Sequence, residues 1–189
     1  VFGQVLVIDK NNFAEVDLTG QIATVVDTHA VWNWDQLPKE EKLWDRSIRE
    51  NILSGGLTRY AYWYKIDVEN FATDQYLVLS DPPMDEVDVY FVNDSGLIRY
   101  SRSGASLAFE KREAKVTDYY FILPQSSYTC YIRLKKYEGF QCPLSIASIK
   151  YFTGKEQKNN LAFGFYFGIL FVLIFYNLFI YFSLKEKSY

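Results

Sequence analysis

Cysteine, proline and excess charge are all scarce in this 189-residue sequence, and each scarcity excludes a class of protein. The chain has 2 Cys, 5 Pro and 10 Gly, too few for a disulfide-dense scaffold or a collagen-like chain. Its 20 Lys and Arg against 23 Asp and Glu give a net charge of -3, so nucleic acid is not expected as a partner. The abundant residues are hydrophobic (49%) and aromatic (19%), which predicts a packed core rather than disorder.

One long stretch near the C-terminus carries no charge at all. It lies between Lys158 and Lys185, and its apolar part covers residues 161–184. As a helix these residues would extend roughly 36 Å, enough to cross a hydrocarbon core of about 30 Å. A buried core helix is the alternative, but such helices carry a polar stripe and are seldom this long. The sequence therefore predicts a transmembrane helix.

Three residues in this stretch suit packing against other transmembrane helices. Gly164 and Gly168 form a small-xxx-small pair that lets two backbones approach closely. Asn177 is a lone amide in an apolar helix, and an unpaired amide facing lipid is costly. The alternative for the glycine pair is that glycine is simply common in such helices. A helix that served only as an anchor would not need Asn177.

Charge alone does not orient this helix in the membrane. Lys150, Lys155 and Lys158 precede it, and Lys185 and Lys187 follow it, so the positive-inside rule does not place the N-terminal part. The sequence begins with Val rather than Met and stops five residues after the span, so we expect a fragment of a longer chain.

The rest of the chain has the pattern of an all-β sandwich. Short runs of aromatic and β-branched residues alternate with turn clusters about every ten residues. The predicted strands cover residues 60–69, 76–80, 87–92, 97–102, 118–123, 128–135 and 143–150, with an eighth at 5–8. The segment from 9 to 59 is less regular. There we expect short strands at 15–18 and 22–26, a helix from Pro38 to Ile48, a turn at 54–56, and packing roles for Trp32, Trp34 and Trp44.

Five segments together carry a resemblance to a known family. They are YWYKIDVEN (62–70), PPMDEVDVYFVNDSG (82–96), SGASLAFEKRE (103–113), YIRLKKYEGFQCPLSI (131–146) and GFYFGILFVLIFYNLFIYFSLKEKSY (164–189). Their order and spacing resemble the bacterial seven-transmembrane receptors with diverse intracellular signalling modules, specifically their second type of extracellular domain and first membrane helix. At Lys65 the sequence differs from the Arg usual in the family, which keeps the charge but loses the bidentate fork.

The resemblance implies both an architecture and a location. It implies a jelly-roll sensor domain over 1–155, similar to carbohydrate-binding modules and placed in the periplasm. Residues 156–189 would then form the first transmembrane helix and the start of the cytoplasmic side, in the bacterial inner membrane. Other helices of the same receptor are implied partners, a homodimer is compatible with it, and the intact receptor would carry a cytoplasmic kinase, cyclase or phosphatase module.

Catalytic and metal chemistry find little support in the sequence. His29 is the only histidine, and neither cysteine has a base nearby in sequence, so we expect no enzyme and no required cofactor. Calcium is the one metal to consider, because carboxylates with loop carbonyls can bind it. The acidic residues concerned are Asp81, Asp85, Glu86 and Asp88. A solvated acidic loop is the simpler interpretation.

A polar sheet face is the predicted ligand-binding site. Period-two alternation places one aromatic and one charged residue of each of three strands on the side away from the core. These residues are Trp63, Lys65, Asp88, Tyr90, Tyr131 and Arg133. Aromatic rings suit the C–H faces of sugars and charged groups suit their hydroxyls, so a glycan or another small polar ligand is expected. Truncating Trp63 or Arg133 to Ala should then weaken binding and leave the fold intact. The alternative is an ordinary sheet face covered by the N-terminal segment.

The two cysteines permit two outcomes. Cys130 and Cys142 both fall on the core-facing side of their strands, and a fold-back near residue 136 would set them opposite each other. A disulfide is one outcome, and two buried reduced thiols are the favoured one.

The favoured interpretation is thus a periplasmic ligand-sensing domain with the first membrane helix of a signalling receptor. The rival is a single-pass, membrane-anchored binding or adhesion module without a signalling role.

Overall fold

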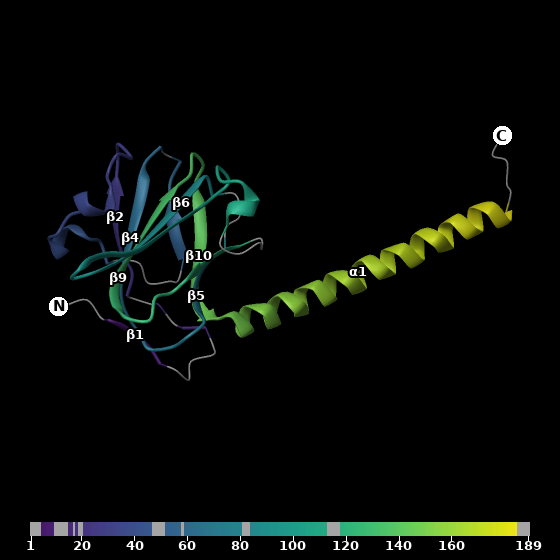
Figure 1. Ribbon diagram of the computed structural model, residues 1–189. Helices are drawn as coiled ribbons and strands as arrows, with labels where there is room; N and C mark the ends of the chain where they lie inside the picture. The colour runs from purple at the N-terminus through teal and green to yellow at the C-terminus, as the bar shows by residue number, and fades with distance from the viewer. Residues whose placement is uncertain are drawn as a thin grey trace. The chain divides into compact units, whose positions relative to one another are not determined.

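The computed structural model describes residues 5–9, 15–16, 18, 21–46, 52–57, 59–80, 84–112 and 118–184. The chain divides into two compact units, Val1–Ile149 and Lys150–Tyr189. All described strands belong to the first unit, and the second is built from one long helix (Figure 1).

Two β-sheets form the first unit. The larger has the strand order β1-β4-β9-β6-β7, formed by β1 (Leu6–Ile8), β4 (Ala61–Asn70), β9 (Ser127–Lys135), β6 (Glu86–Asn93) and β7 (Gly96–Ser103). A sixth strand, β2 (Ala23–Asp27), pairs with the start of β4, while β1 pairs in parallel with its end. The smaller sheet has the order β3-β10-β5-β8, formed by β3 (Ile52–Gly55), β10 (Phe140–Ser148), β5 (Gln75–Leu79) and β8 (Tyr119–Ile122).

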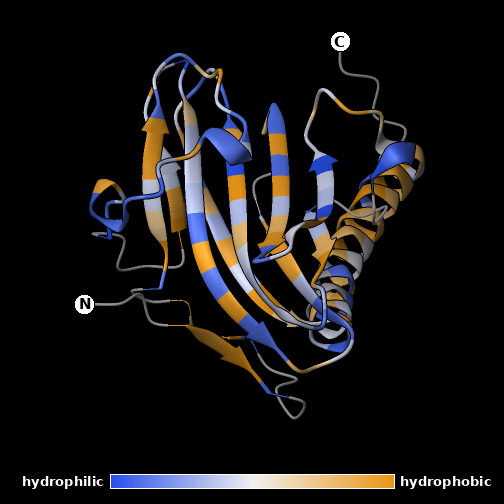
Figure 2. Ribbon diagram, turned by 60° about the vertical axis from the view of Figure 1, so that its left-hand side comes forward, coloured by the Kyte–Doolittle hydropathy of each residue, from blue (hydrophilic) through white to orange (hydrophobic). Residues whose placement is uncertain are grey.

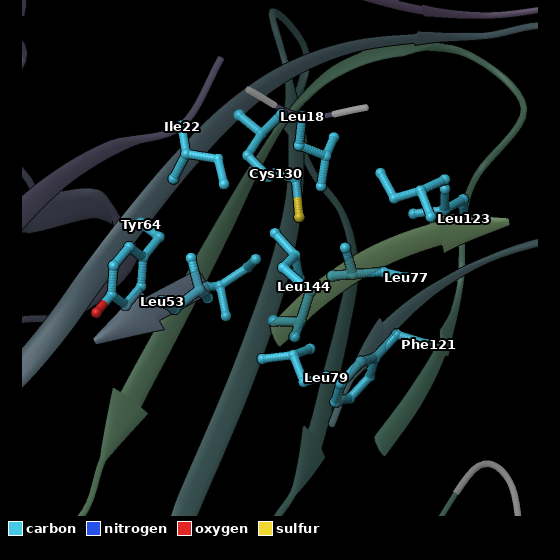
Figure 3. Packing of buried hydrophobic residues seen from close by; sticks show 14 of the residues in the cluster. Leu18, Ile22, Leu53, Tyr64, Leu77, Leu79, Phe121, Leu123, Cys130 and Leu144 are labelled. Carbon is cyan, nitrogen blue, oxygen red and sulfur yellow. The ribbon is translucent and has the colours of Figure 1, made fainter. Parts of the chain in front are cut away.

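The hydrophobic core lies between these sheets. Ile66, Val89 and Ile132 come from the larger sheet, and Leu77 and Leu144 come from the smaller one; all are buried. Figure 3 shows Leu77 and Leu144 beside Cys130, and hydrophilic and hydrophobic residues alternate along the long strands in Figure 2. The sequence-based expectation of an all-β sandwich is confirmed, as is the side of each strand that faces the core.

The predicted helix from Pro38 to Ile48 is wrong over the residues that the structure describes, which here end at 46. Two short 3-10 helices, η1 (Trp34–Gln36) and η2 (Glu41–Leu43), stand in this region instead. Asp45 forms an isolated bridge with Thr24, with both backbone N–H···O distances at 2.8 Å. This pairing with β2 holds the backbone extended immediately after η2, so tertiary contacts override helix propensity.

Two smaller expectations also change. The turn expected at 54–56 is in part strand β3, which pairs with the first residues of β10. Of the strand expected at 15–18, the structure shows an isolated bridge between Val16 and Ile146, while residue 17 lies outside the described residues. A third 3-10 helix, η3 (Phe109–Lys111), was not expected.

Both cysteines are buried and free. Cys130 lies on β9 in the larger sheet and Cys142 on β10 in the smaller one, so the chain crosses between sheets after β9. The fold-back that would set the two residues opposite each other in one hairpin is therefore not formed, and each thiol fills core volume.

The second unit contains the transmembrane candidate. Helix α1 (Ile149–Leu184) includes a 25-residue segment, Asn160–Leu184, that is long and apolar enough to cross a membrane. The predicted span of 161–184 is confirmed on length and composition. The last predicted strand, 143–150, ends at Ser148 because the helix starts at the next residue.

Candidate ligand-binding face

The six predicted site residues come together on the outer face of the larger sheet. They form two cross-strand rows on the adjacent strands β4, β9 and β6. In the first row the backbone registers pair Trp63 with Arg133 and Arg133 with Asp88; in the second they pair Lys65 with Tyr131 and Tyr131 with Tyr90. The prediction that they share one face is thus confirmed by strand register.

Residues 31–46, called the covering segment below, pack over part of this face. All four tryptophans gather there with Ala23, Val25, Leu37, Tyr90 and Tyr131. The Trp63 ring is fully buried and stacks on Tyr90 at a centroid distance of 5.7 Å. Trp44 from the covering segment lies 5.9 Å from the Tyr131 ring. A ligand therefore cannot stack on Trp63 in this structure, because the ring is already covered. At this end of the face the alternative expectation, a sheet face covered by the N-terminal segment, is the correct one.

The charged residues of the first row form an ion-pair network. One guanidinium nitrogen of Arg133, Nη1, donates to Glu86 Oε2 at 2.8 Å and to Asp88 Oδ2 at 2.9 Å. Asp88 Oδ1 accepts a further bond from Tyr100 Oη at 2.7 Å. Burial by itself would lower the pKa of Arg133, but the hydrogen bonds and charges of Glu86 and Asp88 raise it. Arg133 thus neutralises a buried carboxylate and stays charged itself.

Lys65 forms a separate ion pair with the covering segment. Its ammonium donates to Glu41 Oε1 in η2, and Arg46 Nη2 donates to Glu41 Oε2 at 2.8 Å. Hydrogen bonds from Lys65 and Arg46 hold the pKa of Glu41 below its usual range. The Lys65 ammonium also lies 6.0 Å from the centroid of the Trp44 ring. One carboxylate is therefore shared between two cations.

An open polar groove of about 470 Å³ continues from this face along the same sheet. It is lined by Val5, Asp67, Val68, Val92, Asn93, Asp94, Ser127, Tyr128, Thr129 and Tyr131. Asp67 and Thr129 are cross-strand partners, and the Thr129 hydroxyl donates to Asp67 Oδ1 at 2.8 Å. The β6–β7 turn, in which Asn93 Oδ1 accepts from Ser95 N–H at 2.9 Å, brings Asn93 and Asp94 to the groove.

Sequence reasoning missed this groove although part of its signal was present. Asp67 shares the face of Trp63 and Lys65 by the same alternation, and Tyr131 belongs to both the predicted face and the groove. The position of Asn93 and Asp94 depends on how the hairpin folds over the sheet, which strand periodicity does not report.

Several other expectations concern catalysis and metals. His29 is exposed in the turn after β2, where its Nδ1 contacts the neighbouring Thr28 hydroxyl at 3.1 Å. Burial raises the pKa of the Cys130 thiol, the opposite of what a nucleophilic cysteine needs. Within the described part of the chain, no three His, Cys, Asp or Glu side chains are grouped to hold a metal ion. Asp81, one of the proposed calcium ligands, lies outside the described residues, so the calcium hypothesis stays a prediction.

The helix residues singled out in the sequence lie on different sides of α1. Gly164 and Gly168 line a groove on the helix together with Leu161, Phe165 and Ile169 among others. A Cβ added at either glycine would meet no atom within 4 Å. Asn177 Nδ2 donates to Leu173 O one turn earlier at 2.8 Å, so its amide group is partly satisfied inside its own helix.

Comparisons with known proteins agree with the resemblance in the sequence. Residues 19–148 match the family described as 7TMR-DISM extracellular 2. No curated protein matches significantly. A crystal structure of the enzymatically active domain of bacteriophage CBA120 tailspike protein 4 is similar over 75% of this chain and 20% of that chain, with 10% identity and a TM-score of 0.32. This chain thus spans about a fifth of the tailspike domain, and so distant a likeness carries no argument.

The family match covers more than half of the chain, including every strand of the larger sheet except β1. The chain therefore belongs to the 7TMR-DISM extracellular 2 family, the second type of extracellular domain of the seven-transmembrane receptors with diverse intracellular signalling modules.

Proposed function

We propose that this domain senses a glycan or another small, hydroxyl-rich ligand in the periplasm and signals through the helices of a receptor in the bacterial inner membrane. The family match supports the part of this proposal that describes an extracellular domain of a membrane receptor. The observation that carries the ligand class is the open groove on the outer face of the larger sheet. A binding role fits a family of extracellular receptor domains.

The chemistry of the groove suits hydroxyl groups. Sugar hydroxyls donate and accept hydrogen bonds, and the groove offers carboxylates at Asp67 and Asp94, an amide at Asn93 and a hydroxyl at Thr129. Tyr131 adds an aromatic ring at the groove's border with the predicted face. A few fixed polar groups beside an aromatic wall are typical of small-ligand sites.

The structure changes the roles proposed for the six predicted residues. Tyr131 lines the groove and Lys65 is its cross-strand neighbour, and both are proposed to contact the ligand. Arg133, Asp88 and Tyr90 are proposed to position them, through the ion-pair network and ring packing in the neighbouring rows. Trp63 is proposed to hold the Tyr90 ring in place, since the two rings stack.

Binding to a panel of neutral and acidic oligosaccharides tests the ligand class. The detergent-solubilised chain should bind at least one member, and Asp67→Ala and Tyr131→Ala should each weaken that binding roughly 5- to 150-fold, which corresponds to about 1–3 kcal/mol. Glu110→Ala on the exposed η3 is the control and should bind like the parent. Parental affinity in both groove variants would show that the ligand binds elsewhere.

Signalling is proposed to follow from a ligand-dependent shift between two conformations of the receptor. In the full-length receptor, ligand should change the activity of the cytoplasmic kinase, cyclase or phosphatase module, as in two-component signalling. The rival function, a membrane-anchored binding or adhesion module, predicts binding with no change in output. Labelling of an engineered Cys at Ser188 by an impermeant reagent from the periplasmic side would contradict the proposed orientation.

A further inference from the structure

The Glu41 carboxylate is held as a bound anion would be held. Lys65 donates to one of its oxygens and Arg46 donates to the other, so each oxygen has its own cation. The carboxylate comes from η2 in the covering segment, whereas Lys65 comes from the centre of β4. Two converging cations bind an anion such as a carboxylate more strongly than a neutral hydroxyl.

The two partners of this ion pair differ in exposure. The side chain of Lys65 is only 12% exposed, while that of Glu41 is 57% exposed. The ring of Trp44 lies beside the ammonium, and Tyr131 is its cross-strand neighbour. The cation is thus built into the face, whereas the anion reaches it from the solvent side.

The segment that carries Glu41 has little secondary structure of its own. η2 is a three-residue 3-10 helix without a side-chain cap. The segment is joined to the sheet by the Thr24–Asp45 bridge and by the packing of Trp44 on Tyr131. Short 3-10 helices have weak hydrogen-bond geometry, so η2 restrains Glu41 less than a longer helix would.

We infer that Glu41 occupies a carboxylate subsite of the ligand-binding face, and that the sensed ligand is an acidic sugar whose carboxylate takes the place of Glu41 on Lys65 and Arg46. This inference rests on the proposed function and specifies its ligand class.

The groove and the cation pair are spaced for one such ligand. Lys65 and Asp67 are two residues apart on the same face of β4, roughly 7 Å along the strand, which is comparable to the span of one sugar ring. Tyr131 lies next to Lys65 and also lines the groove. Asp67 and Asp94 would repel a carboxylate inside the groove, so the acid group is directed to the cations and the hydroxyls to the groove.

Matched sugars test this directly. Binding of oligogalacturonates and other uronate-containing oligosaccharides is compared with binding of the same molecules as methyl esters, which lack only the charge. The detergent-solubilised chain should bind the acids about tenfold more tightly than the esters. Glu41→Ala should raise affinity for the acids roughly 5- to 10-fold and leave ester binding unchanged, because it removes the internal competitor.

One control and two further variants separate this effect from general changes. Glu40→Ala removes a neighbouring carboxylate that pairs with the exposed Lys42, and it should bind both sugar forms like the parent. Lys65→Met and Arg46→Met should each reduce the preference for acids over esters, and melting temperature identifies a variant that is unfolded. Arg46→Met gives the test if Lys65→Met fails to fold.

Four results would overturn the inference. Equal binding of acids and esters, or no gain of acid affinity in Glu41→Ala, would show that the ion pair is structural, while the proposed polar-ligand function would stand. Binding of neutral sugars alone would have the same meaning. Absence of binding to every member of the acidic and neutral panel would instead overturn the proposed function, and this inference with it.

Discussion

At the scale of single residues, burial decides whether a side chain on the predicted face can contact a ligand or instead stabilises the fold. Trp63, Asp88 and Arg133 occupy the predicted face, yet Trp63 is fully buried, and the side chains of Arg133 and Asp88 are only 11% and 6% exposed. We therefore expect Trp63→Ala and Arg133→Ala to destabilise the fold rather than to leave it intact. Truncating a buried Trp typically costs about 3–5 kcal/mol. Alternation in a strand gives the face on which a side chain lies, but it does not show what covers that face.

Replacing Arg133 with Met should destabilise the domain strongly. The substitution leaves the buried Asp88 carboxylate without the guanidinium that neutralises it, a change expected to cost about 3 kcal/mol. For a chain of this length, that corresponds to a fall in melting temperature of roughly 6–12 °C, measured by circular dichroism. Arg102→Met is the matched control. Arg102 approaches Asp88 at 3.5 Å from a half-exposed position, so its loss should cost less than about 1 kcal/mol. Equal losses in the two variants would contradict the central role of Arg133.

Acid should weaken the same network through Glu86. Burial raises the pKa of Glu86, but the hydrogen bond from Arg133 and the charges of Lys135 and Arg102 lower it below its ordinary value of 4.5. A carboxyl with a lowered folded-state pKa contributes stability that is complete above the unfolded value and is lost as pH falls through the folded value. The urea midpoint should therefore drop as pH falls below about 4.5. The drop should be smaller in Glu86→Gln, and an equal drop would show that other carboxyls account for it.

At the scale of elements, the sequence predicts strands with a strong period and fails where tertiary contacts decide. The long strands β4, β6, β7 and β9 alternate clearly and were placed to within two residues. β3 was missed because Ile52–Gly55 is short and ends in glycine, so only its pairing with β10 makes it a strand. The expected helix after Pro38 competes with the burial of Trp44 against Tyr131 and with the Thr24–Asp45 bridge. An isolated helix of that length is marginal, so these contacts prevail.

The covering segment should behave as a local unit. Trp44 is its buried anchor: the ring packs beside Tyr131 and its Nε1 donates to Pro38 O at 3.0 Å. Trp44→Ala should therefore raise hydrogen–deuterium exchange in residues 31–46 at least about tenfold, while the amides of β9 remain protected. Lys39→Ala, at an exposed position of the same segment, should leave exchange unchanged. A uniform increase throughout the domain would mean that Trp44 supports the whole sandwich instead.

At the scale of the whole molecule, we propose separate partners for two surfaces, the outer face of the larger sheet and helix α1. The face offers polar groups to a ligand, whereas α1 exposes apolar side chains along its length. Two features interrupt this apolar surface: the groove lined by Gly164 and Gly168, and the amide of Asn177. At about 100° per residue, Asn177 lies roughly 140° from Gly164 and 180° from Gly168. The glycine groove and the amide therefore face opposite directions, and we expect α1 to pack between two other helices of the receptor rather than against one.

Filling the glycine groove should disturb the assembled receptor but not the helix itself. An added Cβ at Gly168 meets no atom within 4 Å, so we expect a penalty in Gly168→Leu to come from a neighbouring helix that needs the space. In the full-length receptor in detergent, Gly168→Leu should lower the melting temperature by several degrees. Ala162→Leu is the matched control, since it also enlarges a small residue but lies outside the groove. Asn177→Leu should cost less, about 1 kcal/mol, because its amide already donates to Leu173 O and loses only the bond to a second helix. If Gly168→Leu and Ala162→Leu both melt like the parent receptor, the glycine groove faces lipid. Helix α1 would then have a neighbouring helix on its Asn177 side alone.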